Sequence, residues 1–276
     1  MKKALLLLAL VFLTATPALA AGKESAFDRV VRTGTLRCAY IVYPPETIKD
    51  PNTGKLSGTI VDLTEEAGRQ LGWTIDWVVE VGFSDMFDGL KSGKYDALCS
   101  GLWESPARAK NALFTIPINY GVHYAFSRAG DDRFDKDIDA ANNPEIKIAV
   151  IDGEYADFVA KESFPRAQTY RLPHLSDVSQ VLLSVATGKA DIAFLQKASA
   201  RGFLENNKGK LKVIENPVRV MPAPAIVVAS EEQQLKNVLD AAFRFLLNNG
   251  FVEKTLRKYD PKLDSYNLIA KPYEVQ

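Results

Sequence analysis

The stretch Ser92–Tyr120, SGKYDALCSGLWESPARAKNALFTIPINY, decides how this chain is expected to fold. It predicts a strand that runs into a loop, a turn at SPAR (residues 105–108), and a second strand-like run. Such a turn can place an arginine and free backbone N–H groups at the mouth of a cleft, where a small anion can bind. A shorter version, GKADIAF at residues 188–194, recurs in the second half. Two related strand starts predict two similar lobes with a ligand cleft between them.

The first 20 residues have the layout of a secretory signal sequence. Lys2 and Lys3 precede an apolar run from Ala4 to Leu13, and ALA at residues 18–20 is a small-x-small cleavage site. The apolar run is shorter than the ~20 residues that a membrane-spanning helix needs. No cysteine stands at the cleavage site to take a lipid. We therefore expect a periplasmic protein from which residues 1–20 have been removed.

Composition excludes several classes of function. The remaining length suits two domains of ~100–200 residues. The chain has 34 Lys+Arg against 34 Asp+Glu and no basic tract, so no nucleic-acid partner is expected. His123 and His174 are the two histidines, and neither stands at ligand spacing from a cysteine. No metal and no other cofactor is therefore expected. Cys38 and Cys99 are compatible with one disulfide or with two buried thiols.

Alternating strand and helix patterns predict an α/β fold with a largely parallel sheet in each half. The first half has expected strands at Thr35–Val42, Trp73–Val81 and Tyr95–Leu102, and expected helices at Gly58–Leu71 and Phe83–Leu90. The second half has expected strands at Lys147–Ile151, Gln168–Leu172 and Asp191–Leu195, and expected helices at Tyr155–Glu162 and Val178–Thr187. Crossover strands are expected at Gly121–Arg128 and Val218–Ala229, and final helices at Leu235–Asn249 and Val252–Lys258.

Ligands of such sheets bind beyond the carboxyl ends of the strands. That rule places Tyr43 after the first strand, Phe83 after the second, and Ser100–Trp103 after the third. We therefore expect these residues around one site.

Five short motifs in a fixed order carry a family resemblance. They are GTLR at residues 34–37, GTIVDL at 58–63, GLKSGKYD at 89–96, Ser105-x-x-Arg108, and the terminal pattern from NG at 249–250 to KY at 258–259. With these motifs the chain resembles the family 3 solute-binding proteins, the periplasmic amino-acid-binding components of ABC importers. The resemblance extends from about Phe27 to Tyr259, nearly the whole chain after the signal sequence.

The resemblance implies a two-lobed type II periplasmic-binding-protein fold. Each lobe would hold a mixed, mostly parallel sheet flanked by helices, and two crossover strands would form the hinge. We expect lobe 1 at residues 21–122 plus 225–276, and lobe 2 at residues 123–224. The expected partners are a small-molecule ligand and the ABC transporter permease in the inner membrane. The protein itself is expected to be a monomer.

The resemblance also assigns candidate ligand-binding residues. Arg108 matches the arginine that grips the α-carboxylate of the ligand, and a guanidinium fork fits a carboxylate. Ser105 matches the hydroxyl position beside it. The other matched positions are a strand end (Ser100, Gly101), two aromatic walls (Phe83, Tyr43) and a helix N-terminus that closes on the carboxylate (Glu154, Tyr155).

The chain departs from the family pattern inside the expected pocket. Gln196 stands where an aspartate binds the α-ammonium group, and Trp103 replaces a small hydroxyl residue. Tyr155 replaces a threonine, while Glu154 and Glu46 add carboxylates. We therefore expect a small carboxylate-bearing polar solute, an amino acid or a related compound, read by Arg108. A cationic group on it would be held by the added carboxylates or by cation–π contact with the aromatic residues.

No catalytic motif is present. There is no Ser-His-Asp or Cys-His order, no GxSxG and no HExxH, so the chain is expected to bind its ligand without chemistry. The alternative is an enzyme, because periplasmic cyclohexadienyl or arogenate dehydratases resemble this family. Glu154 would then be the general acid. A sensory module that signals through a separate partner is a third possibility.

Overall fold

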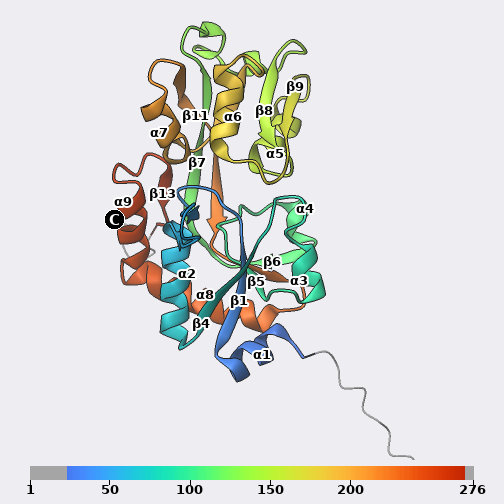
Figure 1. Ribbon diagram of the computed structural model, residues 1–276, viewed down its shortest axis with the longest axis vertical. Coiled ribbons are helices and arrows are strands. Elements are labelled where there is room, and N and C mark those ends of the chain that lie inside the picture. Colours follow the sequence, from blue (N-terminus) through green and yellow to red (C-terminus); the bar gives the residue numbers. More distant parts are fainter. Residues whose placement is uncertain (1–23, 271–276) are drawn as a thin grey trace, which may run out of the picture.

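The structure is a computed structural model that describes residues 24–270. Figure 1 shows two lobes stacked along the long axis and joined by extended strands. The predicted signal sequence at residues 1–20 lies outside the described residues. Within residues 24–270, no helix is both long and apolar enough to cross a membrane.

Lobe 1 is built on a five-stranded sheet. Its strand order is β4 (Thr74–Glu80), β1 (Thr35–Tyr40), β5 (Ala97–Leu98), β12 (Val227–Ala229) and β6 (Ala112–Phe114). The first three strands pair in parallel, and β12 pairs antiparallel with both β5 and β6. The helices of this lobe are α1 (Ala26–Thr33), α2 (Thr59–Leu71), α3 (Asp88–Ser92), α4 (Pro106–Ala109), α8 (Gln233–Asn248) and α9 (Phe251–Tyr259).

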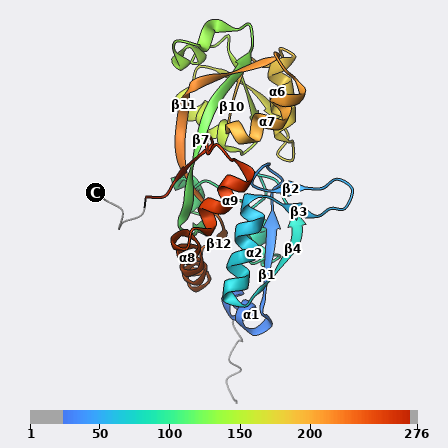
Figure 2. The same ribbon diagram turned by 90° about the vertical axis from the view of Figure 1, so that its left-hand side faces the viewer.

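A small hairpin of β2 (Ile48–Lys49) and β3 (Leu56–Ser57) belongs to the same lobe. Figure 2 shows its loop projecting outward beside the gap between the lobes.

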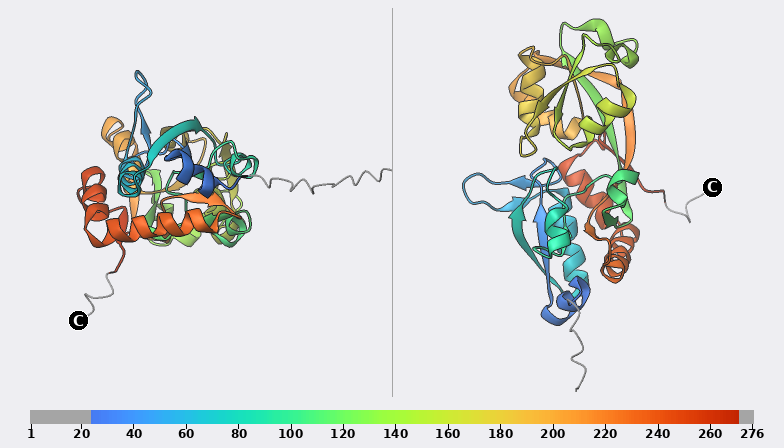
Figure 3. Two further views of the ribbon diagram at one scale, coloured as in Figure 1. Left: turned by 90° about the horizontal axis from the view of Figure 1, so that it is seen from below. Right: turned by 90° about the vertical axis from the view of Figure 1, so that its right-hand side faces the viewer.

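Both faces of the lobe 1 sheet are buried. Leu36 and Cys38 of β1 pack on the side of α2 and α8, whereas Ala39 packs on the side of Leu90 in α3. Figure 3 shows α8 running along the underside of this lobe. Each residue of β1 is buried or partly buried, and residues that favour strands, such as Thr35 and Tyr40, made TLRCAY recognisable as a strand. Cys38 forms a disulfide with Cys99, the residue after β5, so the disulfide alternative is the one that the structure adopts.

Lobe 2 is built on a six-stranded sheet. Its order is β11 (Leu211–Pro224), β7 (Pro117–Arg128), β10 (Ile192–Leu195), β8 (Lys147–Ile151) and β9 (Gln168–Leu172), and β13 (Tyr266–Leu268) pairs with β7. The helices of this lobe are α5 (Tyr155–Ser163), α6 (Val178–Ala186) and α7 (Lys197–Asn206), with the 3-10 turns η1 (Asp132–Phe134) and η2 (Ile138–Ala141). The predicted α/β class and two-lobed fold are confirmed.

The two recurring sequence motifs have the same structural role in the two lobes. Asp96 of GKYD accepts a hydrogen bond from the backbone N–H of Arg37 at 2.8 Å and donates its own N–H to the Arg37 carbonyl at 2.9 Å. Asp191 of GKAD does the same with Lys147, at 2.9 Å and 2.8 Å. Asp96 therefore fixes β1 against β5, and Asp191 fixes β8 against β10. The recurrence noticed in the sequence reflects this shared clamp.

Strands β7 and β11 are the long crossovers. They pair antiparallel from Leu211↔Arg128 to Pro224↔Pro117. The predicted return crossover at Val218–Ala229 is wrong in its bounds, since β11 starts at Leu211 and the chain then enters β12 of the lobe 1 sheet. The lobe boundaries at 122/123 and 224/225 remain our proposal.

Two other predicted bounds are too long. The expected helix Phe83–Leu90 begins only at Asp88, and the expected strand Tyr95–Leu102 is regular only at Ala97–Leu98. Gly101, with φ +62, turns the chain out of the sheet and donates its N–H to the Ala225 carbonyl at 3.0 Å. The chain therefore leaves the sheet early in order to form a wall of the cleft.

Candidate functional site

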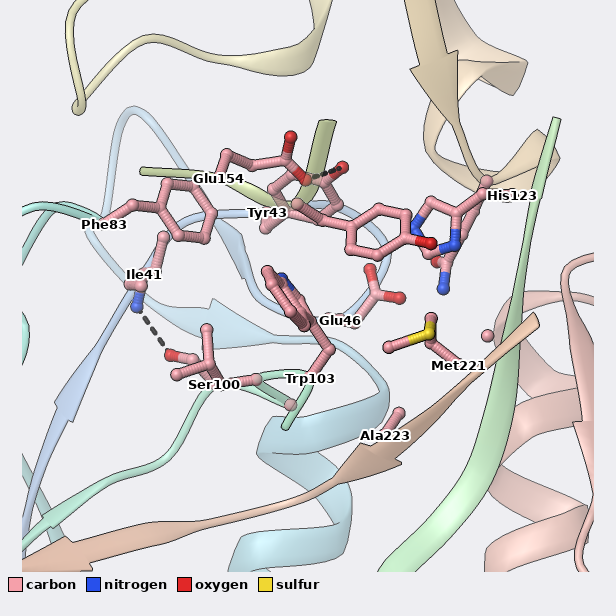
Figure 4. Close-up of a pocket in the computed structure, with 15 residues that line it drawn as sticks. Ile41, Tyr43, Glu46, Phe83, Ser100, Trp103, His123, Glu154, Met221 and Ala223 are labelled. Carbon is pink, nitrogen blue, oxygen red and sulfur yellow. Dashed lines mark hydrogen bonds between the residues drawn. The ribbon is translucent and has the colours of Figure 1, made fainter. Parts of the chain in front are cut away.

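A cavity lies between the lobes, where the carboxyl ends of β1, β5 and β8 meet the crossover strands. Figure 4 shows the side chains of both lobes converging on it. The residues that line it are Ile41, Tyr43, Glu46, Phe83, Ser100, Gly101, Leu102, Trp103, Gly121, His123, Glu154, Tyr155, Gln196, Met221 and Ala223.

Backbone contacts hold the lobe 1 wall in place. The hydroxyl of Ser100 accepts the N–H of Ile41 at 2.7 Å, which ties the loop after β5 to the end of β1. A Cβ on Gly101 would lie 2.8 Å from Ile60 Cγ1, so both the space and the positive φ require glycine. Tyr43 and Thr47 exchange two backbone hydrogen bonds of 2.9 and 3.0 Å. This closed loop presents Tyr43 and Glu46 to the cavity.

Aromatic rings from both lobes form the sides of the cavity. Tyr43 meets Phe83 edge-on, with centroids 6.1 Å apart at 88°. Trp103 of lobe 1 meets Tyr155 of lobe 2 at 5.0 Å and 76°. His123 of β7 lies against the same Tyr155 ring at 4.1 Å. Rings at such angles turn both edges and faces toward an occupant.

Two buried carboxyl groups face the cavity from opposite lobes. Glu154 is the N-cap of α5: its Oε2 accepts the N–H of Ala156 at 2.7 Å, and its Oε1 lies 3.4 Å from the hydroxyl of Tyr43. Glu46 Oε1 accepts the hydroxyl of Tyr266 at 2.8 Å. Burial raises the pKa of each carboxyl to about 7.

Arg108 lies behind the cavity wall and is not among the residues that line it. Its guanidinium stacks on the Trp103 ring, 3.9 Å from the ring centre. One terminal nitrogen donates to the Trp103 carbonyl at 3.1 Å and the other to the Gly153 carbonyl at 2.7 Å. Burial lowers the pKa of Arg108 to about 10, which still leaves the side chain charged at neutral pH. Its role as a carboxylate clamp remains a prediction.

Ser105 also stays outside the cavity lining. It is the N-cap of the four-residue α4, and its hydroxyl accepts the N–H of Arg108 at 3.3 Å. Gln196 does line the cavity, at the start of α7, and Gln196 Oε1 is buried with no hydrogen-bond partner among the described residues. Its role in ligand binding, like that of the other predicted site residues, stays a prediction.

Several lining residues were not predicted. Gly121 lies on β7, and Met221 and Ala223 lie on β11. The sequence could have indicated them, because the crossover strands pass the cleft and alternate residues of a strand lie on the same face. His123 of β7 also lines the cavity, and burial lowers its pKa to about 3, so its ring is neutral.

Direct contacts close the lobes over the cavity. Besides Arg108, the hydroxyl of Ser84 donates to Asp152 at 3.0 Å across the cleft. Gly153 has φ +75, and a Cβ there would lie 3.2 Å from the Phe83 carbonyl, so only glycine allows this close approach. Within residues 24–270, no group of three or more His, Cys, Asp or Glu side chains is arranged to hold a metal ion.

Two α/β lobes, paired crossover strands and a cavity between them are the features of the type II periplasmic-binding-protein fold. The chain belongs to the bacterial extracellular solute-binding proteins, family 3, whose profile matches residues 36–262.

Similar proteins support the same assignment. A probable histidine-binding protein of Campylobacter jejuni is 23% identical over 218 residues, covering 79% of this chain and 81% of that protein. The arginine-binding extracellular protein of Bacillus subtilis is also 23% identical, covering 79% and 82%. A crystal structure of an ancestral amino acid-binding protein, described as a precursor of cyclohexadienyl dehydratase, has a TM-score of 0.75 at 22% identity. The match covers 86% of this chain and 99% of that one.

Proposed function

We propose that this chain is the periplasmic substrate-binding protein of an ABC importer and traps a small polar solute between its lobes by hinge closure. The observation that carries the proposal is the cavity between the lobes, whose lining comes from the loops after the strands of both lobes and from both crossover strands. Ligands of open α/β sheets bind at the carboxyl ends of strands, and here two such edges face each other.

The hinge follows from the connectivity. Only a few residues of β7 and β11 need to change their backbone angles for the lobes to separate, which is the usual pattern of hinge closure in periplasmic binding proteins. The ligand shifts the population toward the closed form because it contacts both lobes there. The closed form would then be recognised by the permease in the inner membrane.

The solute class is an amino acid or a related compound. The names of the Campylobacter and Bacillus relatives support that class for them, and the cavity of this chain combines aromatic walls with polar groups. If Arg108 binds the ligand carboxylate directly, the guanidinium must give up its hydrogen bonds to the Trp103 and Gly153 carbonyls and donate to the carboxylate instead. The layout of residues 1–20 supports export, and we propose that the protein acts as a monomer without nucleic acid.

Isothermal titration calorimetry tests the proposed function. A panel of L-amino acids, small amines and small carboxylates is titrated into the purified protein, and nuclear magnetic resonance of the mixture reports any conversion. We expect one-to-one binding of at least one class, with the solute unchanged. No binding up to about 1 mM, where the free energy of association is only about −4 kcal/mol, would contradict the proposal.

The buried carboxyl of Glu154 favours one alternative, a dehydratase. A carboxyl with a pKa of about 7 at neutral pH suits a general acid. Incubation with prephenate or arogenate, followed by detection of phenylpyruvate or phenylalanine, separates the two functions. Product formation that disappears in Glu154→Gln would replace the transport proposal.

A further inference from the structure

The unpartnered buried polar atoms of the cavity lining include the donor Trp103 Nε1, the hydroxyl of Tyr155, and two side-chain oxygen acceptors. Glu46 is 8% exposed, and its Oε2 has no hydrogen-bond partner among the described residues. Gln196 is 7% exposed, and the same holds for its Oε1. In Figure 4 the Glu46 carboxylate points into the space enclosed by Tyr43, Trp103 and Met221. Buried acceptors without partners are costly, so the occupant is expected to supply N–H or O–H donors.

Among residues 24–270, no lysine or arginine side chain lines the cavity. His123 is neutral at physiological pH because burial lowers its pKa. Glu46 of lobe 1 and Glu154 of lobe 2 both lie near the hydroxyl of Tyr43, whose pKa burial and these two charges raise. Closure therefore buries two carboxyl groups in one cavity, and a cation bound there would offset the cost of burying their charges.

The two features that suit an anion are already occupied by the protein itself. The guanidinium of Arg108 donates to the carbonyls of Trp103 and Gly153 and is covered by the Trp103 ring. The N-terminus of α5 is capped by the carboxylate of Glu154, which accepts the Ala156 N–H. A ligand carboxylate would have to displace one of these contacts, and Glu154 would repel it from the second.

The aromatic walls are suited to a cation. Tyr43, Phe83, Trp103 and Tyr155 line the cavity from both lobes, and ring faces attract ammonium and guanidinium groups, more strongly when water is excluded. Since the unpartnered acceptors of Glu46 and Gln196 require donors, the cation should carry N–H groups.

We propose that the cleft selects a small organic cation, a primary amine or guanidine held between Glu46 and Glu154, and that it needs no α-carboxylate on the ligand. The proposal rests on the proposed function, in that the cleft is taken as the solute-trapping site. It differs from the sequence prediction, in which a carboxylate is the group recognised.

Matched ligand pairs that differ only in the carboxylate test the proposal. Agmatine is compared with L-arginine, and cadaverine with L-lysine, by calorimetry on the purified protein. We expect the amine of at least one pair to bind at least about tenfold more tightly than its amino acid, a difference of about 1.4 kcal/mol. Tighter binding of the amino acid in both pairs overturns the cation proposal and leaves the trap intact. If none of the four binds up to about 1 mM, the cation proposal is also rejected, and only the wider panel decides about the trap.

One variant and its control show whether the carboxylate of Glu46 is responsible for amine binding. Glu46→Gln keeps an acceptor for the Tyr266 hydroxyl but removes the charge, and we expect it to weaken amine binding at least about tenfold. Glu145→Gln is the matched control, because Glu145 is exposed at the opposite end of β8 from the cavity. Equal affinities of the Glu46→Gln variant and the unmodified protein would overturn the proposal, and a single cooperative thermal unfolding transition confirms that the variant is folded.

Discussion

At the scale of single residues, Arg108 links the two lobes. Its two terminal nitrogens donate to a carbonyl after β5 and to a carbonyl after β8. A charged donor that bonds to both lobes stabilises the closed form alone, because opening separates its two acceptors.

We therefore expect Arg108→Ala to weaken binding of agmatine and L-arginine by similar factors. The loss should be about 1–3 kcal/mol, the usual value for hydrogen bonds from a charged group. Arg108→Lys is the control that keeps the charge but loses the planar fork. Its affinity for both ligands should lie between those of the unmodified protein and Arg108→Ala. Calorimetry with both ligands distinguishes the possible roles of Arg108. A loss of affinity confined to L-arginine would show that Arg108 binds the ligand carboxylate.

Glu46 and Glu154 make stability depend on pH. Burial raises the pKa of both carboxyls to about 7 in the folded protein, against ~4.3 in an unfolded chain. A raised folded-state pKa gives stabilisation that is complete at low pH and is lost as pH rises through about 7. We expect the free energy of unfolding of the ligand-free protein to fall between about pH 5 and about pH 8, by up to ~3 kcal/mol per carboxyl.

Urea unfolding over that pH range measures this effect. The difference between the unmodified protein and Glu46→Gln isolates the contribution of one carboxyl, because all other titrating groups are shared. If the difference in free energy of unfolding between the two proteins does not change with pH, the raised pKa of Glu46 is contradicted.

Cation binding should have the opposite pH dependence. Glu46 faces Tyr266 and Asp260, and Glu154 faces Arg108 and Tyr43. An amine that stays protonated favours the ionised carboxylates, so its affinity should rise as pH increases through about 7. Calorimetry with agmatine across this range checks the sign, and an affinity that falls with rising pH would point to recognition of an anion.

The residues at the strand ends were predictable, but their partners were not. Tyr43, Phe83 and Trp103 follow from the rule that ligands bind beyond strand ends, and all three line the cavity. The sequence does not show that the Arg108 fork is occupied by two carbonyls, because one of them, Gly153, is 45 residues away. The contact between Glu46 and Tyr266 spans 220 residues and has no local signal.

At the scale of elements, the aspartate clamps explain why the two lobes share a sequence motif. Asp96 forms ion pairs with Arg29 and Arg37, and its side chain is 1% exposed. Asp191 plays the same role in lobe 2 with Arg128 and Arg133, but its side chain is 18% exposed.

Asp96→Asn should destabilise the protein by about 3 kcal/mol, because it removes the charge from a buried ion-pair network. Asp191→Asn is the matched comparison in the other lobe, and its cost should be smaller since its partners are more hydrated. Urea unfolding of both variants measures the two values. A larger loss for Asp191→Asn would contradict the interpretation that burial sets the strength of each clamp.

Elements with strong periodicity were predicted well, and irregular ones were not. The bounds of β8 and β9 match the prediction, because both strands are short runs bounded by turns. Helix α7, KASARGFLEN, was missed; Ala200 is its one buried residue, so it presents little apolar sequence to the core. Strand β13 was missed because it is held by pairing with β7, a contact that no local pattern reveals.

At the level of the whole molecule, we expect closure of the lobes to depend on charge. In the ligand-free protein, closure buries the carboxyl groups of Glu46 and Glu154, and burial disfavours their ionised forms, so the open form is favoured when both are ionised. A bound cation removes that cost and contacts both lobes at once. Binding of the cation and closure of the lobes should therefore occur together.

Small-angle X-ray scattering measures whether a bound cation closes the two lobes. The radius of gyration is measured at about pH 8, where the carboxylates are ionised, with and without saturating agmatine. We expect a smaller radius with agmatine and no contraction in the Glu46→Gln, Glu154→Gln double variant. An unchanged radius in the unmodified protein, at agmatine concentrations where calorimetry shows full binding, would contradict this expectation.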